Sequence, residues 1–476
     1  MNRRPNQIFK KTATTFRSIL ITTQRKSLAL PVMKYPRLNK QIFIENRKRF
    51  VAQMEPNSIA IFHSNYQYSW NGDAVYKFKQ NSDMFWASGI DQEESVLVLF
   101  PDCPVDAYQE CLFLVETNAK IAIWEGYKYT KEDATATSGI KNIFWNHEYM
   151  QQLRQVINLA DNIYLPLNEN DRFNPKSPTK ALDFAKEIME LYPIHTFKRA
   201  GKILNRLRGT KTELELEVMR ESVQISKKGL LRILETTKPG MGEYEIEANL
   251  AHTFLSNRAS GFSFEPIVAA GKNACTLHYL ENKDEVKDGD LILVDCGVDY
   301  ANYASDMTRC LPANGKFSPR QKDVYNATLR VMKAARKMLV PGTMLMEYQK
   351  DVELLMTEEL IGLGLLTAEE VKNQDPAWPA VKQYFMHGTS HFLGVDVHDS
   401  GLRYEPMAVG MVFSCEPGIY IAEEGIGVRI ENQILITENG PVDMMDEAGM
   451  PIEVEEIEAL MAFGEELIIE NTDIAK

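Results

Sequence analysis

The clearest pattern along the chain is a run of four apolar residues that leads directly to an acid. Residues 291–294 are all apolar, which is typical of a strand buried on both faces, and Asp295 follows them. A glycine and polar residues come next, and a second acid, Asp306, precedes Thr308 and Arg309. A carboxylate at the end of a buried strand must be compensated inside the fold. From this stretch alone, a salt bridge to a nearby Arg or Lys and a bound metal ion are both open.

The apolar pattern from residue 33 to about residue 205 predicts an α/β domain. Helical spacing of apolar residues alternates with β-rich runs bounded by polar residues or proline, in the segments 40–54, 58–64, 95–100 and 175–191. Residues 121–124 form a further short apolar run. Nothing in this domain has a catalytic spacing, so we expect it to be non-catalytic.

The pattern changes near residue 206, where longer amphipathic helices begin. Thr212 and Glu215 have the spacing of a capping box at a helix N-terminus. Two Pro-Gly breaks, at 239–240 and 341–342, are each followed by an amphipathic helix and then by segments that carry acids. We interpret this repetition as a faint internal duplication, with both halves contributing to one site. The predicted division is a basic tail, an N-terminal domain and a catalytic domain, over residues 1–32, 33–205 and 206–476.

Composition limits the class of protein further. A chain of 476 residues is too long for one ordinary core, so two or three domains are expected. A formal net charge of −13 argues against binding to nucleic acid or to an anionic membrane, because both require a basic surface. No apolar run reaches the length of a membrane span. The six cysteines show no CxxC pair, which favours free thiols in a reducing, cytoplasmic compartment over disulfides or a zinc site.

The first 32 residues differ from the rest of the chain. They are basic, rich in Ser and Thr and free of acids, and the first acid of the chain is Glu45. That composition resembles a transit peptide, whereas the long apolar core and cleavage site of a secretory signal are missing. We favour a disordered tail, or an over-extended start with Met33 as the true initiator.

Three of the chain's eight histidines occur within twelve residues, at His387, His391 and His398. A single buried histidine is usually a hydrogen-bonded core residue. Here three histidines occur together with glycines, which let backbone segments approach closely. A functional site is therefore as good an interpretation of this segment as a set of core histidines. Glu416 then ends an apolar run before a Pro-Gly turn, and Glu431 belongs to the predicted strand that begins near residue 427.

Four carboxylates and one histidine could therefore form one ligand set. For each acid alone, a surface or ion-paired carboxylate is the simpler interpretation, but all four lie at the edges of apolar strands. Such an oxygen-rich set without sulfur suits Mn²⁺, Co²⁺ or Fe²⁺ better than a thiolate zinc site. Five side chains exceed the needs of one small ion, and bridging carboxylates hold two ions about 3.5–4 Å apart in known dinuclear sites.

These motifs resemble the pita-bread metallopeptidases, specifically aminopeptidase P and the related prolidases. The resemblance rests on the spacing of the acids over 295–306, on HGTSHFLGVDVHD (387–399), and on SCEPGIYI and GVRIEN. In addition, KQNSDMFW (79–86) is similar to the QNSDF segment of the family's non-catalytic domain. The resemblance implies an α+β fold: a pita-bread catalytic domain with an internal pseudo-two-fold duplication, preceded by an α/β creatinase-like N-terminal domain.

The resemblance also implies five metal ligands. Asp295 would be a terminal ligand of one metal, and Asp306 and Glu431 would bridge both metals. His391 and Glu416 would complete the second metal, and Glu416 would also handle a proton beside the bridging hydroxide. The implied cofactor is two divalent ions, with Mn²⁺ expected first and Co²⁺, Fe²⁺ or Zn²⁺ as alternatives.

Four further residues match positions around the substrate in the family. His278 and His398 match substrate-side histidines, and His398 would hydrogen-bond the scissile peptide and stabilise charge on its oxygen. His387 matches a histidine that lines the proline side of the site. Arg429 would orient Asp295 from behind the metal.

The implied activity is release of the N-terminal residue from peptides with proline in second position, by a homodimer or homotetramer. Xaa-Pro dipeptidase (prolidase) shares every ligand and remains open. Methionine aminopeptidase fits less well, because it usually lacks a full N-terminal domain like residues 33–205. A metal-free pseudoenzyme that binds peptides on the same fold would be expected to have lost ligands, whereas all five are present.

Overall fold

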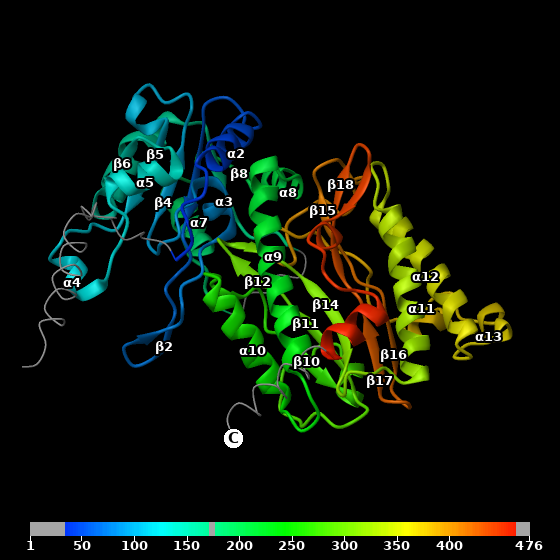
Figure 1. The fold of residues 1–476 in the computed structure, drawn as a ribbon. Helices are drawn as coiled ribbons and strands as arrows, with labels where there is room; N and C mark the ends of the chain where they lie inside the picture. Colours follow the sequence, from blue (N-terminus) through cyan, green and yellow to red (C-terminus); the bar gives the residue numbers. More distant parts are fainter. Residues whose placement is uncertain (1–33, 171–176, 463–476) are drawn as a thin grey trace, which may run out of the picture.

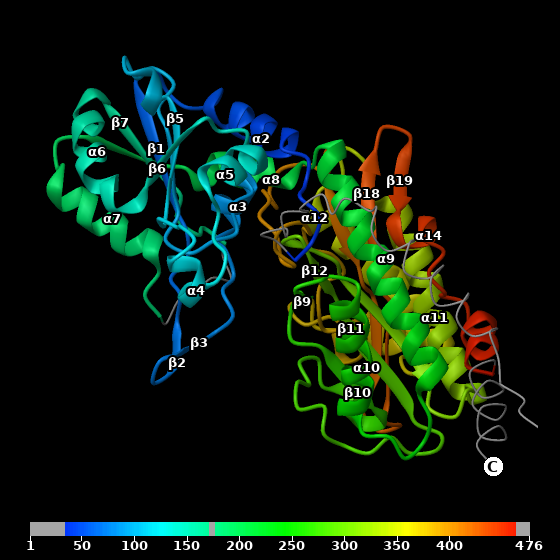
Figure 2. The same cartoon turned by 60° about the vertical axis from the view of Figure 1, so that its left-hand side comes forward.

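The structure, a computed structural model, describes residues 34–170 and 177–462. The described chain forms two lobes that lie side by side, an N-terminal lobe in blue to teal and a larger C-terminal lobe in green to red (Figures 1 and 2). The predictions made for residues 1–32 fall outside the described residues. Within the described ranges, no helix combines the length and the apolar character needed to cross a membrane.

A six-stranded sheet forms the centre of the N-terminal lobe. Its spatial order is β6 (Asn142–Trp145), β5 (Glu110–Leu114), β4 (Val96–Leu99), β1 (Ser58–His63), β7 (Asn162–Leu165) and β8 (Thr196–Arg199). Only β4 runs antiparallel to its neighbours in this sheet. The helices that pack on the sheet are α2 (Gln41–Val51), α3 (Ser82–Ser88), α5 (Lys131–Ser138), α6 (Tyr149–Val156) and α7 (Lys180–Leu191).

Strand β1 shows why the sheet is covered on both faces. All six of its residues are buried, and successive side chains of a strand point to opposite faces. Ile59 and Ile61 join a core with α6 and α7, whereas Ala60 and Phe62 join a core with α2 and α3. The second of these cores continues without a break into the C-terminal lobe, where it includes Leu293. The two lobes therefore share one hydrophobic core.

The strands predicted over 58–64 and 95–100 are present as β1 and β4, and the helix predicted over 175–191 is α7. The apolar run 121–124 is instead part of a short helix, α4 (Ile121–Glu125), in which Trp124 is 90% exposed. Strand β5, which pairs with β4, has no counterpart in the predicted elements. All six cysteines are free, and five of them are buried.

The C-terminal lobe consists of two halves of similar construction. The first half has α9 (Glu213–Thr236), α10 (Glu243–Ser256) and a sheet of β10 (Ile267–Ala270), β11 (Leu291–Cys296) and β14 (Met307–Pro312). The second half has α11 (Pro319–Ala335), α12 (Leu345–Gly362), a sheet of β15 (Val412–Cys415), β18 (Asn432–Thr437) and β19 (Gly440–Asp443), and the hairpin β16 (Gly418–Ile421) and β17 (Ile426–Arg429). Figure 1 shows the helices on the outside and the strands between them. The predicted capping box of Thr212 and Glu215 begins α9.

Strands β11 and β14 set the positions of the first two acids. They pair antiparallel, with Asp295 opposite Thr308. Gly297 follows β11, and a side chain there would place its Cβ 1.8 Å from the backbone oxygen of Ser305. Only glycine permits this close approach, which leads the chain back to Asp306 beside the end of β11.

Candidate metal centre

The nine residues singled out in the sequence line one cavity of about 710 Å³. They come from both halves of the C-terminal lobe, on and beside strands β11, β14, β15, β17 and β18, and they are His278, Asp295, Asp306, His387, His391, His398, Glu416, Arg429 and Glu431. At the centre of the group, ligand atoms of Asp306, His391 and Glu431 all lie within 4.8 Å of one another. That spacing is compatible with a shared metal ion.

Asp295 on β11 and Glu431, which directly precedes β18, are held by one buried arginine and one buried threonine. Arg429 Nη2 donates to Asp295 Oδ2 at 2.5 Å, and Arg429 Nε donates to Thr308 Oγ1 at 3.1 Å. The hydroxyl of Thr308 in turn donates to Glu431 Oε2 at 2.8 Å. Asp295 and Glu431 are thus each oriented through one oxygen. Thr308 was not predicted as a site residue, although it follows Asp306 by two positions in the stretch that carries the first two acids.

The imidazole of His391 is fixed in one tautomer. Its Nδ1 lies 2.9 Å from the carbonyl oxygen of Phe392, which only accepts, so Nδ1 carries the proton. The opposite nitrogen, Nε2, lies 3.4 Å from both Asp306 Oδ2 and Glu416 Oε1. In a neutral His391 the lone pair of Nε2 would face these two carboxylates, and a cation between the three groups would remove the repulsion. A backbone carbonyl on the other ring nitrogen is the usual support of a metal-binding histidine.

Among the residues that line this cavity, three buried carboxylate oxygens have no hydrogen-bond partner: Asp295 Oδ1, Asp306 Oδ1 and Glu431 Oε1. Each belongs to a different predicted ligand. A buried carboxylate oxygen without a partner is costly in a protein interior. Together with His391 Nε2, the three oxygens form the oxygen-rich donor set that suits hard or borderline divalent ions. The residues present therefore fit a divalent metal site.

The carboxylates of the site also repel one another. Burial raises the pKa of Asp306 well above its ordinary value, and the nearby Asp295 carboxylate raises it further. Burial likewise raises the pKa of Glu431, with Asp306 and Glu416 adding to the effect. Divalent cations among these groups would favour their charged forms and remove the repulsion.

A hydrogen-bonded chain connects the candidate metal site to His387. Arg429 Nη1 donates to the hydroxyl of Tyr420 at 2.7 Å, and that hydroxyl lies 2.8 Å from His387 Nε2. His387 Nδ1 lies 2.8 Å from the carbonyl oxygen of Gly388, so Nδ1 is protonated and Nε2 accepts from Tyr420. Burial, and then the charge of Arg429, lowers the pKa of His387 to about 3. His387 is therefore neutral, with both ring nitrogens bonded to protein. Tyr420 was not predicted, although the quoted motif SCEPGIYI contains it.

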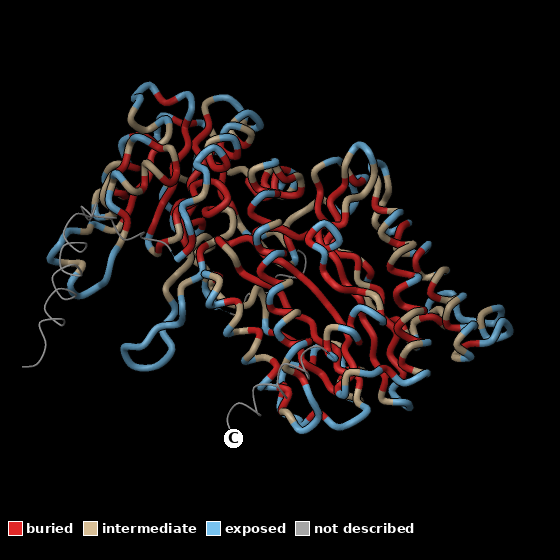
Figure 3. The backbone as a smooth tube through the Cα atoms, viewed as in Figure 1, coloured by how far each residue is buried: buried red, intermediate tan, exposed pale blue. Residues whose placement is uncertain are grey.

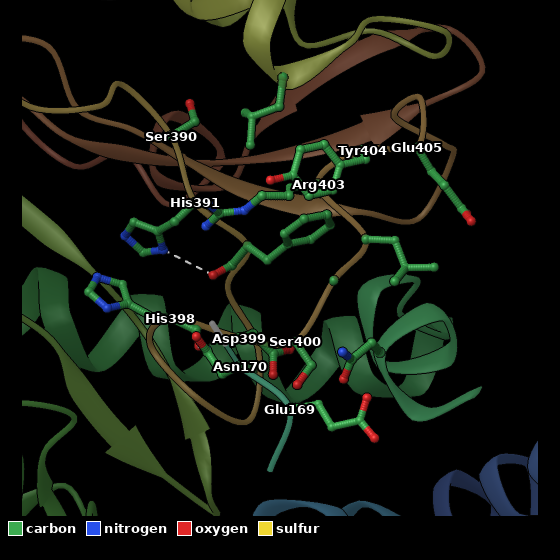
Figure 4. A pocket seen from close by; sticks show the side chains of 15 residues that line it. Glu169, Asn170, Ser390, His391, His398, Asp399, Ser400, Arg403, Tyr404 and Glu405 are labelled. Carbon is green, nitrogen blue, oxygen red and sulfur yellow. Dashed lines mark hydrogen bonds between the residues drawn. The ribbon is translucent and has the colours of Figure 1, made fainter. Parts of the chain in front are cut away.

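The other two histidines lie at the rim of the cavity, where both side chains are exposed. The rings of His398 and His391 are nearly perpendicular, with centroids 4.4 Å apart, and Figure 4 shows the two facing each other. A second cavity of about 310 Å³ adjoins the first at Ser390, His391 and His398. Glu169 and Asn170 of the N-terminal lobe line this second cavity (Figure 4).

The prediction that Arg429 and Glu431 lie on one continuous strand is wrong. β17 ends at Arg429 and β18 begins at Asn432. Between them, the backbone N–H of Glu431 donates to the carbonyl oxygen of Thr308 at 3.2 Å. This bond to β14 in the other half of the lobe brings Glu431 beside Asp306.

Arg309 was one possible partner for the acids of the first half, and its hydrogen bonds go elsewhere. Its guanidinium donates to the carbonyl oxygens of Glu431 at 2.7 Å and Pro451 at 2.8 Å, and to Asn432 Oδ1 at 2.7 Å. It therefore ties the two halves together, and the salt bridge to Asp295 comes from Arg429.

Comparison with known proteins shows which proteins this chain is similar to. The family model described as "Aminopeptidase P, N-terminal domain" matches residues 43–164, and that of metallopeptidase family M24 matches residues 217–438. The Xaa-Pro aminopeptidase of Haemophilus influenzae is 33% identical over 442 residues, which are 90% of this chain and 98% of the relative. The Xaa-Pro aminopeptidase of Escherichia coli is 32% identical over 89% of this chain and 98% of the relative.

The chain belongs to metallopeptidase family M24. The solved structure of Escherichia coli aminopeptidase P with the inhibitor Pro-Leu is similar to it with a TM-score of 0.79 and 32% identity, over 90% of this chain and all of that one (100%). A zinc-substituted form of the Escherichia coli enzyme with product is similar with a TM-score of 0.78 and 32% identity, over 90% of this chain and 99% of that one. The predicted fold, the aminopeptidase P resemblance and the metallopeptidase class are confirmed by these findings. The cofactor of such an enzyme is a divalent metal.

Proposed function

We propose that this protein hydrolyses the bond before proline at the second position of a peptide and releases the N-terminal residue. The observation that carries the proposal is the donor set of three unpartnered carboxylate oxygens and the free Nε2 of His391 in one cavity. The proposed ligands are Asp295, Asp306, His391, Glu416 and Glu431. The matching aminopeptidases P support this substrate class.

The bound metals would supply a water of lowered pKa, which is a nucleophile near neutral pH. Manganese is the proposed native metal. The residues around it hold the donor geometry: Arg429 and Thr308 fix Asp295 and Glu431, and the Phe392 carbonyl fixes His391. Such supporting hydrogen bonds keep each ligand in the orientation that binding requires.

Proton handling is assigned to Glu416. Its Oε1 accepts from Ser414 Oγ at 3.1 Å and lies 3.4 Å from His391 Nε2, inside the cavity. A carboxylate beside the nucleophilic water can accept its proton and then return it. The proline nitrogen must gain a proton as it leaves, as the leaving nitrogen does in the hydrolysis of any amide.

The rim histidines would contact the peptide. His398 and His278 are exposed on the cavity wall, where they would stabilise the negative charge that a carbonyl oxygen of the peptide acquires in the transition state. His387 differs from them. Since both of its ring nitrogens are bonded to protein, it is proposed to contact the proline ring through its face and not as a hydrogen-bond donor.

A prolidase activity, restricted to Xaa-Pro dipeptides, is the second candidate. The cavity of about 710 Å³ continues past His391 and His398 into a second one, so space exists beyond a dipeptide. This favours the aminopeptidase. The test compares Ala-Pro-Pro with Ala-Pro at saturating Mn²⁺, with metal content measured on the same sample. We expect cleavage of the tripeptide, and hydrolysis of the dipeptide alone would overturn the proposal.

Three further features are proposed. The division into residues 33–205 and 206–476 is supported by the match of separate family models to the two parts. A cytoplasmic location is supported by the six free cysteines. A homodimer or homotetramer is proposed from the resemblance to aminopeptidase P, and sedimentation of the purified protein would test it.

A further inference from the structure

A cluster of charged residues, most of them buried, lies where the N-terminal lobe meets the loop that carries His398. Its centre is Arg208 on α8 (Gly201–Gly209), the helix that joins the lobes. Arg208 Nη1 donates to Asp83 Oδ1 at 2.7 Å, and Nη2 donates to Asp396 Oδ2 at 2.7 Å and Asp399 Oδ1 at 2.5 Å. We call these four residues, with Lys211, the Arg208 cluster.

The cluster is costly to bury. The side chains of Arg208, Lys211 and Asp399 are 4%, 2% and 1% exposed. Lys211 Nζ donates to Asp399 Oδ2 at 3.2 Å, so both oxygens of Asp399 are bonded. Although burial by itself raises the pKa of Asp399, the charges of Arg208 and Lys211 hold it below its ordinary value. Because apolar side chains of similar volume often stabilise a core as well as a buried ion pair does, stability alone is a poor account of these charges.

The cluster acts directly on the loop from His391 to Asp399. The loop closes through the backbone N–H of Asp399, which donates to the Phe392 carbonyl at 2.9 Å. Gly394 lies inside it, where a Cβ would come 2.1 Å from Asp399 Oδ2. His398 immediately precedes Asp399, and Figure 4 shows the two next to each other at one end of the cavity. A displacement of the Asp399 carboxylate would therefore move the backbone of His398.

Helix α3 of the N-terminal lobe holds the Arg208 cluster in place. Asp83 and Ser82 lie in the first turn of α3, whose N-cap, Asn81, accepts from the backbone N–H groups of Asp83 and Met84. Ser82 Oγ donates to Asp396 Oδ1 at 2.6 Å. Two neighbouring residues of a capped helix thus hold the two ends of the cluster, Arg208 and Asp396.

We propose that Asp83 and Arg208 are positioning residues for His398, so that the N-terminal lobe sets the placement of a catalytic-site histidine. This inference rests on the role proposed above for His398. It assigns to the N-terminal lobe a part in the reaction, exerted through the Arg208 cluster and without contact to the substrate.

The test is a double-mutant cycle between Asp83→Asn and His398→Ala, with Ala-Pro-Pro at saturating Mn²⁺. Asp83→Asn keeps the size of the side chain and an acceptor for Arg208, and it removes the charge. We expect kcat to fall about tenfold with KM changed less than about twofold, as for other groups that orient a functional side chain. In the His398→Ala background the same change should have no further effect on kcat, because the group that it positions is gone.

The matched control is Lys79→Met, which removes another ion pair between the lobes. Lys79 Nζ lies 2.9 Å from Asp299 Oδ2 on β12 (Val298–Tyr300), and neither residue is hydrogen-bonded to a member of the Arg208 cluster. The kcat of Lys79→Met should equal that of the unaltered protein. The melting temperature and the manganese content of each variant show whether it is folded and loaded. If Asp83→Asn does not fold, Arg208→Lys replaces it, since lysine keeps the charge but cannot bridge three carboxylates.

The outcomes separate the two proposals. If His398→Ala leaves kcat unchanged, the role of His398 is wrong and the inference falls with it. If His398→Ala lowers kcat and the loss from Asp83→Asn is the same in both backgrounds, His398 keeps its role and the positioning inference is overturned. A loss of kcat in Lys79→Met as large as that in Asp83→Asn would also overturn it, because any weakening of the lobe interface would then suffice.

Discussion

Thr308→Val tests the metal centre without altering a ligand. Thr308 is fully buried, and its hydroxyl donates to Glu431 Oε2 at 2.8 Å and accepts from Arg429 Nε at 3.1 Å. Valine has nearly the same shape but lacks the hydroxyl. The substitution therefore frees the second oxygen of Glu431 and removes an acceptor from Arg429, while packing is retained.

The size of the effect follows from the bond that is lost. A hydrogen bond to a charged group contributes about 1.5–3 kcal/mol. If Thr308 holds Glu431 in the orientation that binds metal, that free energy is lost from metal affinity, and each 1.4 kcal/mol corresponds to about a factor of ten. We expect manganese to bind about 10–100-fold more weakly, the range found for groups that orient metal ligands.

The measurement is a titration of chelator-treated protein with Mn²⁺, followed by calorimetry and by hydrolysis of Ala-Pro-Pro. Activity should return at higher manganese concentration. Thr328→Val is the matched control, because Thr328 is also fully buried and donates within α11 to the Val324 carbonyl at 3.0 Å. A manganese affinity of Thr308→Val within about twofold of the unaltered protein would refute the reasoning, and so would an equal loss in Thr328→Val.

Three further substitutions test other parts of the structure. Glu431→Gln should abolish activity with little change in the circular dichroism spectrum, because it removes a carboxylate ligand and keeps its volume; near-normal turnover would contradict a dinuclear site. Tyr420→Phe leaves Arg429 Nη1 and His387 Nε2 without their shared partner, and should lower the free energy of unfolding by about 1–3 kcal/mol; an unchanged urea midpoint would contradict the hydrogen-bonded chain. His63 has a pKa lowered from 6.5 to about 3, first by burial. Between pH 6.5 and about pH 3, the imidazole of His63 binds a proton in the unfolded chain but not in the folded one. The free energy of unfolding therefore decreases as the pH is lowered, by up to about 1.4 kcal/mol per pH unit. His63→Asn lacks this pH-dependent contribution, so between pH 6 and pH 4.5 its urea midpoint should fall less steeply than that of the unaltered protein. Equal slopes in the two proteins would contradict the burial of an uncharged His63.

The sequence by itself determined the local elements and the chemistry of the candidate ligands. The strand β11, the capped start of α9 and the order of acids and histidines all follow from short-range rules of burial, capping and spacing. The motifs were sufficient to indicate the family, because their residue types and intervals are those that a carboxylate-rich metal site requires. These features depend on residues that are close together in the sequence, so the sequence alone is enough to predict them.

Tertiary structure alone decided which groups hold the ligands in place. Glu431 lies beside Asp306 because its backbone bonds to Thr308, more than a hundred residues away, and not because it extends the strand of Arg429. The contacts of Asp83 with Arg208 likewise join parts of the chain that no periodicity connects. Such pairs form only when the shared core of the two lobes brings their elements together, and buried polar groups then take whichever partners that packing offers.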